Sequence, residues 1–103
     1  MDNKPKITLA EAKTILDASC HAPRVTEESI NAKIASVGYH RDAHTTICVI
    51  TMNNGFRFIG TSTPAAPENY VAEIGERYAY DNAYKQIWTH EWYLLRELLS
   101  QQI

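Results

Sequence analysis

The chain has 103 residues, enough for one domain, with a hydrophobic content of 45%, a charged content of 21% and a formal net charge of −2. The negative balance argues against a protein held on nucleic acid by phosphate neutralisation, and two cysteines are too few for a disulfide framework. Residues 1–6 are polar and no apolar run has bilayer-spanning length, so we expect neither a signal peptide nor a membrane segment, and a cytoplasmic location.

We expect a flexible tail over residues 1–6 and a single α+β domain over residues 7–103. The domain begins with two predicted short helices. Thr8 and Glu11 have the spacing of a capping box, and an apolar face then predicts a helix to about Ser19. Thr26 is the predicted N-cap of the second helix, with Gly38 as its stop. The buried stripe of that helix consists of residues at helical spacing: Ile30, Ile34 and Val37.

A β-hairpin is predicted next, with strands over 45–52 and 56–62 around the turn Asn53-Asn54-Gly55. A two-residue loop at Asn54-Gly55 would pair Ile50 with Ile59. One face would then carry Cys48, Ile50, Met52 and Ile59, and the other Ile47, Val49, Phe56 and Phe58. Because both faces are apolar, one must pack on the helices and the other needs more protein, such as a second copy.

A long helix is predicted from Pro67 to about Ser100. One face has small and apolar residues at four-residue spacing: Gly75, Ala79, Ala83 and Ile87. Roughly opposite lies a charge ladder suited to solvent, formed by Glu73, Arg77, Asp81 and Lys85. The segment ends in a leucine-rich run.

A third row on this helix forms an aromatic ridge: Tyr80, Tyr84, Trp88 and Trp92. An unbroken helix would be about 50 Å long, whereas a compact domain of this size is roughly 35 Å across. The helix must therefore either break, for example near Thr89-His90, or project and pack on another copy. We expect self-association, with the aromatic ridge as the interface.

Several polar residues are candidates for metal binding or catalysis. His40, His44 and Cys48, with Cys20-His21, have spacings that would allow zinc binding, but two loop histidines and a buried thiol are the simpler interpretation. No sequence motif surrounds either cysteine to indicate a nucleophile. Glu91 falls on an apolar face and needs a partner, for which Arg57 or a tyrosine hydroxyl are the candidates. We expect no metal, no cofactor and no catalytic residue.

The segment from Gly60 to Thr63 lies between a predicted strand and a helix start, where backbone amides, hydroxyls and the helix dipole would suit an anion. The alternative is a polar connector without a ligand. If the ligand is a nucleotide, its phosphates would be bound by Arg57, Thr61, Ser62 and Thr63. Tyr70 or Trp88 would stack on its base.

The carboxy-terminal half resembles a family of small tailed-phage proteins named after gene product forty-nine of one enterobacterial podovirus and gene sixty-six of another. The resemblance covers roughly residues 25–99. It is carried by Asn54-Gly55-Phe56, Gly60, Ser62, Pro67, Asn69-Tyr70, Glu73, Gly75, Ala79, Ala83, Ile87-Trp88, Glu91 and Tyr93-Leu94-Leu95. The family often has glycine between the last Glu and Tyr, where this chain has Trp92.

The resemblance implies a phage origin and a bacterial cytoplasm, and it brings no established activity. Our first hypothesis is a non-enzymatic accessory protein that binds, as a homo-oligomer, a host defence protein or a small nucleotide signal. The alternative is a virion structural or assembly factor whose long helix docks into a larger particle. A small hydrolase or metal enzyme using His40, His44 and Glu91 ranks last.

Overall fold

The computed structural model describes residues 3–102; residues 1 and 2 of the predicted tail, and residue 103, lie outside the described range. The element order is α1 (Leu9–Ser19), α2 (Glu27–Asn31), β1 (Ile34–Asp42), β2 (Thr45–Met52), β3 (Arg57–Ser62), the 3-10 helix η1 (Pro67–Asn69) and α3 (Ala72–Ser100). The α+β class, the amino-terminal helices and a long last helix are as predicted. The predicted start of that helix at Pro67 is wrong: Pro67 begins η1, and α3 begins at Ala72 after the extended residues Tyr70 and Val71. The predicted hairpin is part of a three-stranded sheet.

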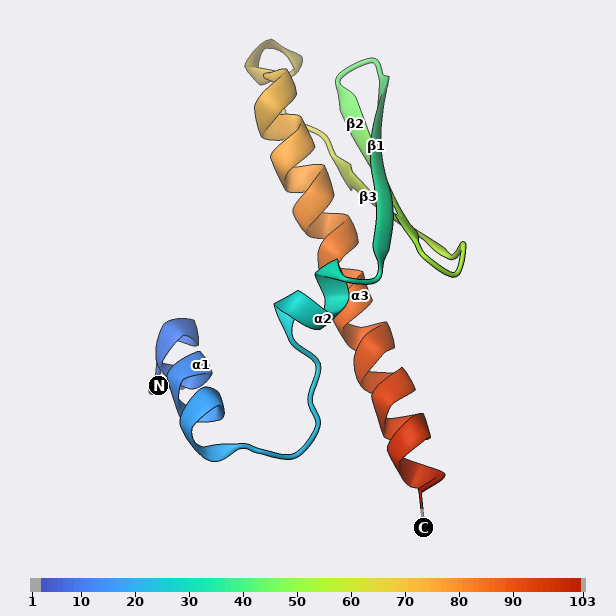
Figure 1. The fold of residues 1–103 in the computed structure, drawn as a ribbon. Helices are drawn as coiled ribbons and strands as arrows, with labels where there is room; N and C mark the ends of the chain where they lie inside the picture. The colour runs from blue at the N-terminus through green and yellow to red at the C-terminus, as the bar shows by residue number, and fades with distance from the viewer. Residues whose placement is uncertain (1–2, 103) are drawn as a thin grey trace.

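The sheet is antiparallel in the order β1-β2-β3, and α3 packs along one of its faces against β2 and β3 (Figure 1). The other face, here called the open face, is covered by no helix among the described residues. Helix α1 stands apart from this body, and none of its residues 9–19 is buried (Figure 1). The radius of gyration is 17.1 Å, against about 13 Å for a compact chain of this length, because α1 and the end of α3 project.

Both predicted helix starts are confirmed by reciprocal capping bonds. The Thr8 hydroxyl accepts from the Glu11 N–H at 3.1 Å, and the Glu11 carboxylate accepts from the Thr8 N–H at 2.9 Å. Thr26 and Ser29 form the same arrangement at 3.0 and 2.9 Å. Each pair satisfies two amide donors that the first helical turn would otherwise leave unpaired.

The predicted extent of the second helix is wrong. It ends at Asn31, and residues 34–42 form strand β1, paired with β2 over almost its whole length. Ile34 and Val37 are spaced like a helical stripe, but their segment pairs with β2 as a strand, a preference that local spacing does not contain. Gly38, predicted as a helix stop, pairs with Val49 in the middle of the strand.

The predicted hairpin register is wrong by one residue. The loop has three residues, 53–55, closed by a bond from the Met52 N–H to the Phe56 carbonyl at 2.8 Å, and Gly55 has φ 91°. Ile50 therefore pairs with Phe58, and Ile59 pairs with Val49. A one-residue shift exchanges the two faces of a strand, so Phe58 joins the core and Ile59 lies on the open face, 56% exposed.

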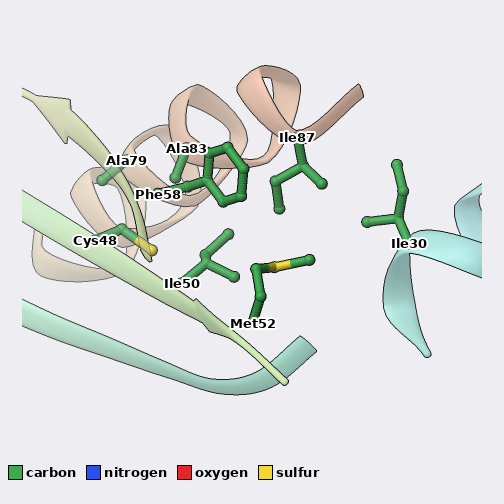
Figure 2. Packing of buried hydrophobic residues seen from close by; sticks show 8 residues of the cluster. All are labelled: Ile30, Cys48, Ile50, Met52, Phe58, Ala79, Ala83 and Ile87. Atoms are coloured by element: carbon green, nitrogen blue, oxygen red, sulfur yellow. The ribbon is translucent and has the colours of Figure 1, made fainter. Parts of the chain in front are cut away.

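The core lies between the sheet and α3, closed at one end by α2. Figure 2 shows Ile50, Met52 and Phe58 extending toward α3, with Ile30 of α2 facing them from the side. The predicted helix face is confirmed, since its four members are all buried: Gly75, Ala79, Ala83 and Ile87. Helix α3 does not break at Thr89-His90, and at 1.5 Å per residue its 29 residues span about 44 Å.

Thr46, on the α3-facing side of β2, is 3% exposed, and its hydroxyl has no hydrogen-bond partner among residues 3–102. An unpaired buried hydroxyl costs about 1–3 kcal/mol. Thr46→Val keeps the shape and removes that group, so we expect the free energy of unfolding to rise by about 1 kcal/mol, measured by urea denaturation. Thr45→Val, which removes a hydroxyl bonded to Thr63 at 2.8 Å, is the control and should give no gain. A destabilised Thr46→Val protein would contradict the expectation.

Candidate functional site

A cleft of about 370 Å³ lies between the β2–β3 loop and the middle of α3. It is lined by residues of both hairpin strands, the hairpin loop, the α2–β1 connection and α3: Lys33, Met52, Asn53, Asn54, Phe56, Phe58, His90, Glu91 and Leu94. The loop is held in place through Asn53, whose N–H donates to the Lys33 carbonyl at 2.7 Å and whose side-chain amide donates to the Ala32 carbonyl at 3.0 Å.

One wall of the cleft is aromatic. Phe56 and Phe58 meet edge to face with ring centroids 5.1 Å apart, and His90 lies 5.0 Å from Phe58. The His90 Nδ1–H donates to the Gln86 carbonyl at 2.9 Å, which orients the imidazole; in the neutral ring the acceptor is then Nε2. Phe56 is 55% exposed, so its ring has a free surface on which another flat group can stack.

The polar groups of the cleft are an ion pair. The Lys33 Nζ donates to a Glu91 carboxylate oxygen at 2.5 Å, and the Glu91 side chain is 14% exposed. The prediction that Glu91 needs a partner is confirmed, but the predicted partners, Arg57 or a tyrosine hydroxyl, are wrong. Lys33 lies 58 residues away in the chain and reaches Glu91 because α2 packs against α3.

A smaller groove of about 140 Å³ continues from the cleft along the carboxy-terminal turns of α3. It shares Lys33, Glu91 and Leu94 with the cleft and adds Leu95 and Leu98 from the helix. Its other wall is formed by the segment before α2 and by α2 itself, with Arg24, Val25 and Ser29. The two hollows together form one surface with an ion pair at its centre and leucines along one arm.

The six residues predicted to bind a ligand are not gathered into one site. Thr61, Ser62 and Thr63 lie together at the end of β3, where the Thr61 N–H donates to the Asn82 side chain at 3.0 Å. Arg57 begins the same strand, about 13 Å away at the usual strand rise. Tyr70 lies beneath the Arg41 guanidinium at 5.2 Å and near the same end of the sheet, since a Cβ on Gly75 would lie within 4 Å of both Tyr70 and Thr46, the strand partner of Ser62. Trp88 lies elsewhere, on α3 beside Trp92.

The aromatic ridge lies mostly within the chain. Tyr80, Tyr84 and Trp88 are partly buried and pack against the core. The Tyr84 hydroxyl donates to the Asn31 side chain at 2.7 Å, and burial raises the pKa of Tyr84 to about 12. Of the ridge, Trp92 is the residue that the structure leaves largely exposed, at 55%.

The residues considered for metal or nucleophilic chemistry lie on separate elements. His40 is on β1, His44 is in the β1–β2 turn, and Cys48 is fully buried in β2. Within residues 3–102 no three His, Cys, Asp or Glu side chains are grouped as metal ligands. Burial raises the pKa of the Cys48 thiol, as expected for the predicted core thiol, while Cys20 is exposed.

Three cleft residues, Lys33, Phe56 and His90, were not predicted to form a binding site. The Asn53-Asn54-Gly55 turn was the available signal, since a three-residue loop with Gly at positive φ points Phe56 toward α3. The sequence allows a helix break at Thr89-His90, and it predicts a longer second helix that contains Lys33. Neither prediction indicates that Lys33 and His90 lie beside the Asn53-Asn54-Gly55 turn.

Fold and cleft together define a small α+β protein in which one long helix supports a three-stranded antiparallel sheet and helps to form an aromatic cleft. Residues 25–99 match the phage protein (N4 Gp49/phage Sf6 gene 66) family, and the chain belongs to this family. The matched segment contains α2, the sheet and all of α3 except its last residue, Ser100, whereas α1 precedes the matched segment.

Comparisons with curated proteins and with solved structures found no similar chain. Among the described residues, no helix combines the length and apolarity needed to cross a membrane.

Proposed function

We propose that this phage protein acts by non-catalytic binding, as a homo-oligomer in the cytoplasm of the infected bacterium, and that the cleft at Phe56 and His90 is its binding site. The observation that supports this proposal most strongly is the cleft itself. Its volume of about 370 Å³ lies in the range of small-molecule sites, which are mostly apolar with a few convergent polar groups. The cleft combines a half-exposed phenylalanine with the Lys33–Glu91 pair.

The chemistry of the cleft suits a flat heteroaromatic ring attached to an anionic group, as in a nucleotide. The ring would stack on Phe56, and Glu91 and the His90 Nε2 would accept hydrogen bonds from its N–H groups. Lys33 would then bind the anionic group, exchanging part of its contact with Glu91. We propose a nucleotide signal of host defence as the ligand. The alternative ligand is a flat aromatic side chain of a host protein, which the same groups of the cleft would bind.

The test is a thermal-shift series with linear and cyclic nucleotides. A ligand at about 100 times its Kd stabilises the folded state by about 2.7 kcal/mol, so a binding nucleotide should raise the Tm by several degrees. Phe56→Ala should weaken binding about 5- to 150-fold, because stacking of one base contributes about 1–3 kcal/mol. Ile59→Ala, at an equally exposed residue outside the cleft, should bind as the wild type does. The absence of a shift with every nucleotide would rule out the nucleotide version.

A second candidate function is a virion structural or assembly factor, favoured by the projecting end of α3. Beyond the sheet this end presents Trp92, Leu94 and Leu98, all at least 41% exposed. An apolar helix end of this kind can pack into a groove of a larger assembly. Mass spectrometry of purified particles separates the two functions: peptides of this chain at structural abundance would support the virion role and contradict the accessory role.

A further inference from the structure

The two edges of the sheet are treated differently by the rest of the chain. On the β3 edge, side chains of α3 bind the backbone groups that have no strand partner. The Thr61 N–H donates to the Asn82 side chain at 3.0 Å, and the Gln86 amide donates to the Ile59 carbonyl at 2.8 Å. On the β1 edge, no backbone or side-chain group within residues 3–102 makes a corresponding bond. One edge is therefore capped and the other is free.

The alternation of an antiparallel ladder identifies the free groups on β1. The Met52 N–H points to the β3 side of β2. Ile50 and Cys48, at two-residue steps along β2, therefore also direct their backbone N–H and C=O groups to β3. The residues between them, Val49 and Ile47, direct theirs to β1. Their partners Gly38 and His40 therefore direct their backbone groups inward. The residues that alternate with these two present their N–H and C=O groups to the free edge: Val37, Tyr39 and Arg41.

Apolar surface lies along the same edge. Val37 and Tyr39 point to the α3-facing side of the sheet, opposite the fully buried Ile50 and Cys48. Because α3 packs over β2 and β3, Val37 and Tyr39 stay 39% and 40% exposed. A shallow hollow beside Tyr39 runs from the free edge to Arg77 and Tyr80 on α3. Protein added at this edge would both complete the ladder and cover this surface.

The strand has little of the usual protection of an edge. Soluble proteins blunt free edges with charged side chains, especially lysine, with proline, with bulges or with very short strands. Strand β1 has nine residues and contains neither proline nor lysine, and its charged residues Arg41 and Asp42 are its last two. Its irregularity lies near its start, between Ile34 and Ser36, and leaves residues 37–42 in regular pairing. These residues can therefore add another strand.

We infer that a second copy of this chain pairs its β1 with β1 of the first, antiparallel about Tyr39, to form a continuous six-stranded sheet. This inference deepens the proposed homo-oligomer and rests on it. In this register all three outward residues are used: Tyr39 faces Tyr39, and Val37 faces Arg41 across the two-fold axis. The inward residues then place His40 opposite Gly38 and Asp42 opposite Ser36, so no like charges are opposed.

The register makes a charge-specific prediction about Val37, because its opposite residue in the other copy is Arg41. Val37→Lys places two cations opposite each other at both symmetry-related positions, and we expect the dimer dissociation constant to rise at least about a hundredfold. Val37→Glu, of similar size and opposite charge, should keep the dimer. The double variant Val37→Lys with Arg41→Glu should restore it. Ile59→Lys, at a more exposed apolar residue away from the β1 edge, is the matched control.

Sedimentation velocity across a concentration series measures the result, with circular dichroism to confirm that each variant is folded. A dimer that is lost in Val37→Lys and retained in Val37→Glu and Ile59→Lys supports the interface. A wild-type monomer would overturn both this inference and the proposed homo-oligomer, leaving the edge for an extended strand of another protein. A dimer that persists in Val37→Lys would overturn the interface alone. The nucleotide thermal shift is read independently of either result.

Discussion

Replacing Gly60 with alanine is expected to lower the free energy of unfolding by about 3 kcal/mol or more, the largest loss expected for alanine at any of the four glycines. Gly60 lies in β3 where the strand passes directly over α3. A Cβ at this position would lie 2.8 Å from the Ala83 Cα and closer still to the Ala83 nitrogen and the Ala79 carbonyl oxygen. These are backbone atoms of a helix, which cannot turn aside as a flexible side chain can, so the strand and helix would have to separate.

Gly38→Ala is the matched control for Gly60→Ala. It adds the same methyl group to the same sheet, but a Cβ at Gly38 meets nothing within 4 Å, and its backbone is not among the positive-φ residues. Alanine there should leave stability unchanged or raise it by up to about 1 kcal/mol. Urea denaturation followed by circular dichroism compares the two. If Gly60→Ala were as stable as Gly38→Ala, the close packing of β3 on α3 would be wrong.

The second large effect is expected for Ile87→Ala, with a loss of about 2–5 kcal/mol. Ile87 is fully buried at the centre of the core, between the sheet and α2, and its removal leaves a cavity beside Phe58 and Ile50 (Figure 2). The surrounding side chains come from three different elements and cannot all move inward together. The transfer and cavity contributions to the loss therefore add.

Ile74→Ala on the same helix is the control for Ile87→Ala. Ile74 is 52% exposed, so its truncation removes little buried area, and alanine has the higher helix propensity. We expect a change within about 0.5 kcal/mol. Thermal unfolding of the two variants and the wild type under one set of conditions measures the difference. Equal losses for Ile87 and Ile74 would contradict the assignment of α3 faces.

Local chemistry explains which parts of the fold were predictable. The capping box at Thr8 and the four-residue spacing of the small residues on α3 each depend on neighbours within one or two helical turns. Such signals are complete within the sequence segment that carries them. Strand β1 was missed because Ile34 and Val37 have a helical spacing, whereas residues three apart lie on opposite faces of a regular strand. They share one face here only through the register shift between Ile34 and Ser36, which the pairing with β2 creates.

The candidate site was less predictable than the fold, because its parts come from distant segments. A loop of three residues in place of two moved Phe58 into the core and left Phe56 beside α3. The Lys33–Glu91 pair joins residues that no local pattern connects. The predicted anion residues Thr61, Ser62 and Thr63 do lie together, but Arg57 and Trp88 of the predicted ligand site lie on other parts of the molecule.

The amino-acid sequence by itself determined the α+β class, the helix starts at Thr8 and Thr26, the buried face of α3 and the family, because each depends on residues close together in the chain or on a shared pattern. The tertiary structure decided that residues 34–42 form strand β1, which register the hairpin has, and where the cleft lies. For each of these features, two local conformations are nearly equal in free energy. The hydrogen bonds between strands and the packing of α2 on α3 favour one of them, and these contacts form only in the folded chain.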